Sequence, residues 1–88
     1  MTIELTLESR AGTYGSFFGV SCLTQDLKSV MRTTDNWNGL SPDQQEALEM
    51  IANKIGRILN GDPDYFDSWH DIAGYATLVA MRLGDDST

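Results

Sequence analysis

The chain has 88 residues, of which 41% are hydrophobic and 22% are charged. This length and composition predict a single domain over residues 1–88 and argue against intrinsic disorder. Thirteen acidic residues against six basic ones give a formal charge of −7, which disfavours general nucleic-acid binding and binding to membrane surfaces. Cys22 has no second cysteine to pair with, and no apolar run approaches the ~20 residues of a membrane span, so we expect a cytoplasmic protein.

The first nineteen residues combine two different patterns. Ile3, Leu5 and Leu7 alternate with polar residues, which is the period of a strand. A lone strand would have no partner in a helical chain unless another subunit supplied one, so we expect residues 1–10 to form a short helix or an extended arm. Residues 11–19 contain three glycines and three aromatic residues, and we expect a loop that its aromatic side chains pin to the core.

Two helices are predicted in the middle of the chain. Apolar residues recur at helical spacing over residues 20–32, and Trp37 in the polar stretch that follows is expected to anchor the core. The second helix, over residues 41–59, has the clearest signals, because Ser41 and Gln44 form a capping box with proline between them at the first helical position. Its apolar residues form one stripe, made of Leu48, Ile51, Ile55 and Ile58.

A last helix is predicted to run to about Leu83, followed by a polar tail, residues 84–88, that should fray. Gly74 lies within this helix, where glycine costs about 1 kcal/mol relative to alanine, so we expect a close helix crossing or a ligand there. The fold class is therefore all-α, a small bundle of three to four helices with a short N-terminal arm. We expect the last two helices to pack antiparallel around a core made of Leu48, Ile51, Ile55, Ile72, Val79 and Leu83.

Charged residues gather on the polar flanks of the last two predicted helices. They are Glu46, Glu49, Lys54 and Arg57 on the first helix and Asp67 and Asp71 on the second. If the helices pack antiparallel, Glu49 and Asp71 should face each other, and converging carboxylates suit a hard cation such as Mg²⁺. The nearby bases would then bind phosphate. Solvated helix faces are the alternative interpretation, and Asp67 also suits the first turn of its helix.

Several of these residues belong to motifs with a family resemblance. The motifs are K-x-x-R at Lys54 and Arg57, then Asp67, then D-x-A-G-Y-A from Asp71, with Tyr14-Gly15 and Asn36-Trp37 upstream. Residues 46–83 resemble a group of phage and prophage proteins that are similar to the MazG-like, all-α nucleotide pyrophosphohydrolases. The resemblance implies a helical bundle, often dimeric, that binds Mg²⁺ and cleaves nucleoside triphosphates to monophosphate and pyrophosphate. With the charge pattern, it predicts catalytic and metal-binding roles for Glu46, Glu49 and Asp71, and nucleotide-binding roles for Lys54, Arg57, Asp67 and Tyr75.

The chain departs from the family signature of E-E-x-x-E followed by E-x-x-D. Gln45 and Ser68 stand where two glutamates are expected, and losing two carboxylates weakens cation affinity. Three functions stay open. The protein is a Mg²⁺-dependent nucleotide pyrophosphohydrolase, a non-catalytic protein that sequesters a nucleotide signal used in host defence, or a phage accessory protein that inhibits a host protein by direct contact. We expect a homo-oligomer in the host cytoplasm, because self-association lets a short chain bury more apolar surface.

Overall fold

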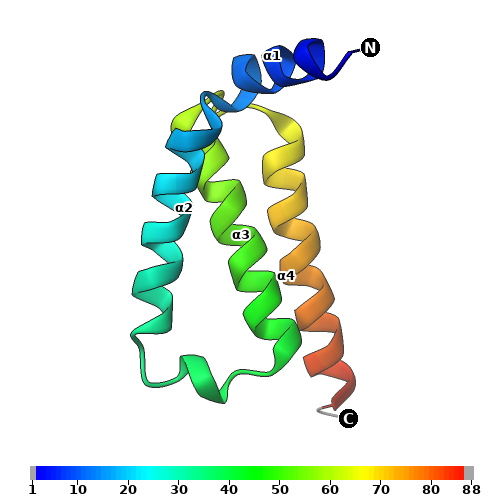
Figure 1. Cartoon of the computed structure of the whole chain (residues 1–88). Coiled ribbons are helices and arrows are strands. Elements are labelled where there is room, and N and C mark those ends of the chain that lie inside the picture. The colour runs from blue at the N-terminus through cyan, green and yellow to red at the C-terminus, as the bar shows by residue number, and fades with distance from the viewer. Residues whose placement is uncertain (1, 87–88) are drawn as a thin grey trace.

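In the computed structural model, which describes residues 2–86, every regular element is helical (Figure 1). The elements in chain order are α1 (Ile3–Tyr14), α2 (Phe17–Arg32), the short 3-10 helix η1 (Trp37–Gly39), α3 (Pro42–Asn60) and α4 (Phe66–Asp86). This architecture confirms the predicted all-α class and small helical bundle. None of the described helices combines the length and the apolar character that crossing a membrane requires.

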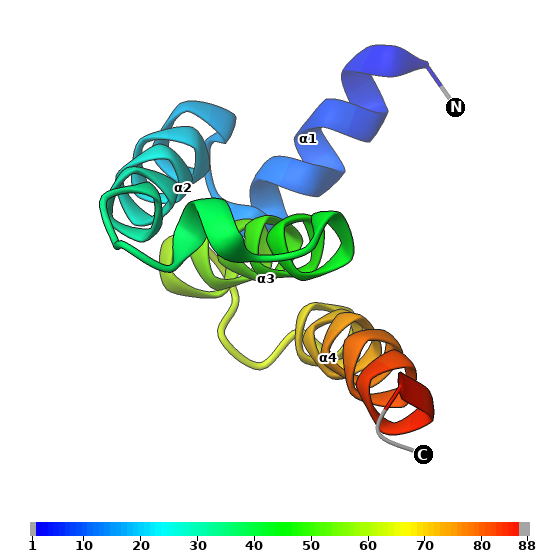
Figure 2. The ribbon, with the colours of Figure 1, turned by 90° about the horizontal axis from the view of Figure 1, so that it is seen from below.

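The central helix of the bundle is α3. The helices α2 and α4 pack against it on opposite sides, and both run antiparallel to it (Figures 1 and 2). The first helix, α1, lies across the end of this layer, where α2 begins and α3 ends (Figure 1). The three long helices therefore form an open layer, in which α2 and α4 each keep a broad face without a covering helix.

The start of α3 forms as predicted. Pro42 is its first residue, and the side chain of Gln44 accepts a hydrogen bond from the Ser41 N–H at 2.9 Å, within the predicted capping box. Trp37 is buried, and its carbonyl oxygen accepts a hydrogen bond from the Gln45 side chain at 2.8 Å. Trp37 therefore anchors η1 to the first turn of α3.

Burial on α3 is wider than the predicted single stripe. Ile58 is buried, but so are Ala52 and Gly56, which lie outside that stripe. The reason is that α3 has a neighbouring helix on each side. Leu48 and Leu83 were expected in the core but are each 41% exposed, because the layer is open where they lie. The other predicted core residues are half-buried: Ile51, Ile55, Ile72 and Val79.

The close helix crossing occurs at Gly56 instead of Gly74. A Cβ atom on Gly56 would lie 2.6 Å from the Thr24 Oγ1 atom and 3.3 Å from the carbonyl oxygen of Val20, both on α2. A Cβ atom on Gly74 would have nothing within 4 Å. Within the described chain, the helix crossing predicted at Gly74 is therefore wrong.

The N-terminal segment is more helical than predicted. Residues 1–10 were expected to form a short helix or an arm, and the helix is correct, with Thr2 capping it by accepting a hydrogen bond from the Leu5 N–H. The predicted loop over residues 11–19 is wrong, because α1 continues to Tyr14 and α2 begins at Phe17. Ser16 makes this early start possible, since its hydroxyl accepts a hydrogen bond from the Gly19 N–H at 3.0 Å.

The aromatic residues of this segment do not pin it to the core as a group. Phe17 and Phe18 are 86% and 79% exposed. Tyr14 alone is half-buried, and its ring packs edge-to-face on Tyr65 with 5.7 Å between the ring centroids. The start of α2 therefore carries an exposed aromatic pair.

Two ion pairs fix the antiparallel register of α3 and α4. Lys54 Nζ lies 3.1 Å from Asp71 Oδ2, and at the other end of the layer Arg82 binds Asp43 with 2.9 Å between Nη2 and Oδ1. The two pairs are eleven residues apart along each helix, which is about three turns. The predicted antiparallel packing is confirmed.

The end of α4 lies beyond its predicted position. The helix continues to Asp86, three residues past Leu83. Its polar residues 84–86 were expected to belong to a frayed tail, and they are helical. The remaining residues of that tail, 87 and 88, lie outside the described residues.

Candidate functional site

The turn between α1 and α2 is fixed to the end of α3. The Asn60 side chain donates hydrogen bonds to the carbonyl oxygens of Tyr14 (3.0 Å) and Ser16 (3.1 Å). The Asp62 N–H donates to the carbonyl oxygen of Thr13 at 2.7 Å. These bonds join segments more than forty residues apart in the sequence, so α1, α2 and α3 meet at one junction.

Glycines allow the two backbones of this junction to touch. Gly15 has a φ of 78°, and a Cβ atom there would lie 2.3 Å from the carbonyl oxygen of Asn60. A Cβ atom on Gly61 would lie 2.3 Å from the carbonyl oxygen of Thr13. Both positions therefore require glycine because a side chain would separate the turn from α3.

A cavity of about 560 Å³ lies in the angle between α1, α2 and α3, next to this junction. Its volume is within the ~300–1,000 Å³ range of small-molecule sites. Its apolar lining comes from α1, α2 and the turn between them: Leu7, Ala11, Gly15, Phe17 and Val20. The polar groups that line it are Arg10, Tyr14, Asn53 and Arg57.

The Arg57 side chain is held in place by aromatic contacts. Its guanidinium carbon lies 4.6 Å from the centroid of the Tyr14 ring, within the range of a cation–π interaction. The Tyr14 ring in turn packs on Tyr65 at an interplanar angle of 89°. Arg57 therefore enters the cavity with its side chain already restrained, which lowers the entropy cost of binding a ligand.

The cavity is a local concentration of positive charge on an acidic protein. Arg10 and Arg57 both line it, and within residues 2–86 neither takes part in an ion pair. Guanidinium groups stay protonated throughout the physiological pH range. The cavity thus presents two cationic hydrogen-bond donors, an aromatic ring and the Asn53 amide to a ligand.

The predicted acidic site does not assemble. Glu49 Oε1 lies 2.7 Å from Arg32 Nη2 on α2, whereas Asp71 pairs with Lys54 on the side of α3 that faces α4. The expectation that Glu49 and Asp71 face each other is therefore wrong. The Glu49 carboxylate belongs to the α2–α3 contact, and the Asp71 carboxylate belongs to the α3–α4 contact. Glu46 is exposed.

These carboxylates do not fit the Mg²⁺ ion that the family resemblance implies. The described part of the chain contains no group of three His, Cys, Asp or Glu side chains that could hold a metal ion. The predicted metal ligands Glu46, Glu49 and Asp71 thus lack the convergence that oxygen coordination of Mg²⁺ needs.

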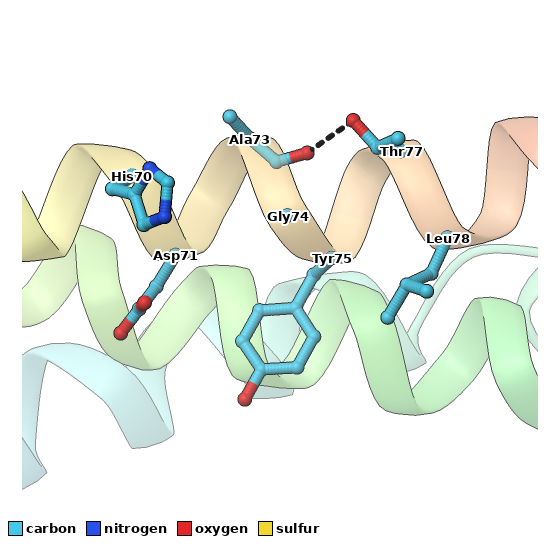
Figure 3. Close-up of a pocket in the computed structure, with 7 residues that line it drawn as sticks. All are labelled: His70, Asp71, Ala73, Gly74, Tyr75, Thr77 and Leu78. Carbon is cyan, nitrogen blue, oxygen red and sulfur yellow. Dashed lines mark hydrogen bonds between the residues drawn. The ribbon is translucent and has the colours of Figure 1, made fainter.

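The residues predicted to bind a nucleotide are separated in the structure. Arg57 lines the cavity. Lys54 is buried and paired with Asp71, so its ammonium group supports the α3–α4 contact. Tyr75 lies on α4, where it lines a shallow hollow together with Asp71 and Gly74 (Figure 3).

Asp67 lies outside the cavity lining and contacts Tyr65. The Tyr65 hydroxyl donates a hydrogen bond to Asp67 Oδ2 at 3.4 Å. The Asp67 carboxylate, followed by Tyr14, raises the pKa of the Tyr65 hydroxyl above its usual value of 10.0. Asp67 therefore contacts the residue on which the Tyr14 ring packs.

Arg10, Tyr14 and Asn53 were missed as site residues, although the sequence contains a signal for them. Asn53 and Arg57 are four residues apart, so they share one face of α3. Arg10 and Tyr14 have the same spacing, but the loop expected at residues 11–19 hid the shared face of α1. The signal is Ser16, a residue type typical of helix N-caps, which indicates that a helix begins at Phe17 and not at Val20.

No protein-family model matches the chain, and no match is found among curated proteins or solved structures. The resemblance to MazG-like pyrophosphohydrolases therefore rests on its sequence motifs. Two of them, Tyr14-Gly15 and the arginine of K-x-x-R, contribute to the cavity.

Proposed function

We propose that this protein binds a nucleotide, or a small molecule derived from one, in the cavity between α1, α2 and α3. The observation that carries the proposal is the presence of Arg10, Arg57 and Tyr14 in one cavity. Guanidinium groups bind phosphate oxygens through paired hydrogen bonds, and aromatic rings and guanidinium planes stack on bases. The Asn53 amide can donate to and accept from a base edge. The MazG-like resemblance supports the same ligand class, since Tyr14-Gly15 and Arg57 belong to its motifs.

We propose binding without hydrolysis. Cleavage by the route implied by the resemblance needs carboxylates around a divalent cation, and Glu49 and Asp71 are engaged by Arg32 and Lys54 instead. Of the three functions left open by the sequence, sequestration of a nucleotide signal by a phage protein is the one that this arrangement supports.

A thermal-shift screen against linear and cyclic nucleotides, with and without Mg²⁺, tests the proposal. We expect at least one nucleotide to raise the melting temperature, because a ligand at 100 times its Kd adds about 2.7 kcal/mol to the free energy of unfolding. The same incubations should release no pyrophosphate. If no nucleotide stabilises the protein, the proposal is wrong.

Arginine variants test the location of the site. Arg10→Gln and Arg57→Gln should each weaken nucleotide binding roughly 10- to 100-fold, because a hydrogen bond to a charged group contributes about 1.5–3 kcal/mol. Lys28→Gln is the control, since it removes one positive charge from α2 at a position that does not line the cavity. Equal nucleotide affinity in all three variants would place the ligand elsewhere.

A further inference from the structure

The segment that connects α3 to α4, residues 61–65, is bound to helices on both sides of it. It lies at the end of the helical layer that α1 crosses (Figure 1). The Asp62 N–H donates to the carbonyl oxygen of Thr13 in α1 at 2.7 Å. The indole Nε1 of Trp69 in α4 donates to the carbonyl oxygen of Pro63, also at 2.7 Å. The segment is therefore held by α1 and by α4 at the same time.

Tyr65 is the last residue of this segment and makes three hydrogen bonds of its own. Its N–H donates to the carbonyl oxygen of Asp62 at 3.4 Å, and its carbonyl oxygen accepts from the Ser68 N–H at 3.3 Å. Its hydroxyl donates to Asp67 Oδ2 at 3.4 Å. Ser68 is buried, so the first turn of α4 is anchored in the core. The Tyr65 ring therefore has a defined position relative to α3 and α4.

Tyr65 contacts the aromatic ring of the cavity without lining the cavity itself. The Tyr65 and Tyr14 rings meet edge-to-face, with 5.7 Å between their centroids and an interplanar angle of 89°, which is a favourable arrangement for an aromatic pair. The residues that line the cavity include Tyr14 but none of residues 61–65. A ligand in the cavity can therefore be influenced by Tyr65 only through Tyr14.

The Tyr14 ring needs support from outside α1. None of the residues of α1 is buried, and the hydrogen bond from Asn60 holds the Tyr14 backbone and not its ring. The Arg57 guanidinium carbon lies 4.6 Å from the centroid of that ring. If the ring were free to rotate, Arg57 would lose the surface on which it lies and would regain rotamer freedom. The orientation of Arg57 thus depends on what holds the Tyr14 ring.

We propose that Tyr65 is a positioning residue of the nucleotide site. It holds the Tyr14 ring in the orientation that keeps the Arg57 guanidinium directed into the cavity, and this role rests on the proposed function of that cavity. The ring of Tyr65 makes the contact, whereas its hydroxyl is directed to Asp67. The connection between α3 and α4 therefore contributes to nucleotide affinity although no part of it contacts the ligand.

Nucleotide affinity measured by calorimetry on variants of the full chain tests this role. Tyr65→Leu keeps an apolar side chain and removes the ring, and it should weaken binding of the most stabilising nucleotide about three- to tenfold. Tyr65→Phe keeps the ring and should bind like the wild type. Phe66→Leu is the control, since the Phe66 ring is exposed and stacks on His70 instead. Tyr65 is only half-buried, so its variants should keep the helical circular dichroism signal.

A double variant separates positioning from a general loss of structure. If Tyr65 acts through Tyr14, its removal has no further effect once the Tyr14 ring is absent. Tyr14→Leu and the double variant Tyr14→Leu/Tyr65→Leu should therefore bind the nucleotide with equal affinity. A further loss of affinity in the double variant would contradict the proposed route through Tyr14.

The side-chain Nε–Hε resonance of Arg57 reports the same contact without any ligand. The resonance is assigned by its loss in Arg57→Gln, and the ring current of Tyr14 should shift it away from those of the other arginines. Tyr65→Leu should move it back toward them, whereas Tyr65→Phe and Phe66→Leu should leave it in place. An unchanged resonance and an unchanged affinity in Tyr65→Leu would overturn the proposal, and so would equal losses in Tyr65→Leu and Tyr65→Phe.

The two measurements also separate this role from the proposed function. If the wild type bound no nucleotide, the proposed function would be wrong, and the Arg57 resonance alone would decide whether Tyr65 positions the guanidinium group. If the wild type bound a nucleotide and Tyr65→Leu bound it equally well, only the role of Tyr65 would be wrong.

Discussion

The guanidinium group of Arg57 lies over the ring of Tyr14, 4.6 Å from its centroid, and this contact joins the last turn of α3 to the last turn of α1. The Asn60 side chain holds the same two helices together through the Tyr14 carbonyl oxygen. The cation and the ring of the proposed nucleotide site are therefore positioned by the junction that also fixes the fold.

The Lys54–Asp71 ion pair is expected to be structural. Asp71→Asn should lower the free energy of unfolding by about 1–2 kcal/mol, because it leaves the buried Lys54 ammonium group without its counter-charge, with Asp71 itself partly solvated. Nucleotide affinity should not change. Urea denaturation measures the effect, and Glu46→Gln, which alters an exposed carboxylate, should stay within about 0.5 kcal/mol of the wild type. A stable Asp71→Asn protein that no longer binds nucleotide would contradict this assignment.

The α2–α3 crossing should not tolerate a side chain at residue 56. Gly56→Ala places a methyl group 2.6 Å from the Thr24 Oγ1 atom, so the helices must separate, at a cost of about 1–3 kcal/mol. Gly12→Ala, at an open helical position, should be neutral or slightly stabilising. Thermal denaturation of the two variants gives the comparison, and equal melting temperatures would show that the α2–α3 crossing has room for a methyl group.

Thr24 offers a stabilising substitution at the same crossing. Its side chain is buried, and among residues 2–86 its hydroxyl oxygen has no hydrogen-bond partner. Thr24→Val keeps the shape and removes the unsatisfied group, which should raise the free energy of unfolding by about 1 kcal/mol. Urea denaturation again measures the change. A loss of stability would show that the hydroxyl is satisfied in solution.

The Asp43–Arg82 pair should make the free energy of unfolding depend on pH in the acidic range. The Arg82 guanidinium, followed by the Ser41 hydroxyl, lowers the pKa of the Asp43 carboxyl from 3.8 to about 2. Because the folded pKa lies below the unfolded value, the stabilising contribution is complete above pH 4 and is lost as the pH falls toward 2. Urea midpoints between pH 2 and pH 5 should fall more steeply for the wild type than for Asp43→Asn. Asp35→Asn, at an exposed position between α2 and η1, should keep the wild-type slope.

Nucleotide binding should order α1. None of its residues is buried, so its amide protons should exchange readily in the free protein. A phosphate bound by Arg10 and Arg57 would tie α1 to α3, and hydrogen exchange should then slow in α1 while the amides of α4 stay unchanged. Protection confined to α4 would contradict the placement of the ligand.

Local sequence signals were sufficient where the interaction spans few residues. The capping box at Ser41 and Gln44 and the burial of Trp37 follow from short patterns, and the antiparallel α3–α4 pair follows from hydrophobic spacing. Such local signals do not show which residues of two helices come into close contact. Gly56 and Gly74 look alike in sequence, and only the position of α2 decides that the first is a close contact.

The prediction of an acidic site at Glu49 and Asp71 was wrong for a related reason. Helical spacing shows which side of α3 carries Glu49, but it does not show that Arg32 at the end of α2 reaches that carboxylate first. The prediction rests on α3 and α4 alone, whereas α3 lies between α2 and α4. The cavity was not predicted because it forms beside the short turn at Gly15-Ser16. The composition of residues 11–19 predicts a long loop at this place instead.

The most direct test of the proposed site is an NMR titration. Nitrogen–proton correlation spectra of the uniformly labelled chain are recorded while the most stabilising nucleotide is added. The predicted result is a set of saturable shift changes centred on Arg10, Tyr14, Asn53 and Arg57, with the side-chain resonances of both arginines moving. Arg57→Gln should abolish these changes at the same nucleotide concentration. Shift changes centred instead on Glu46, Glu49 and Asp71, or no shift changes with any nucleotide, would contradict the account.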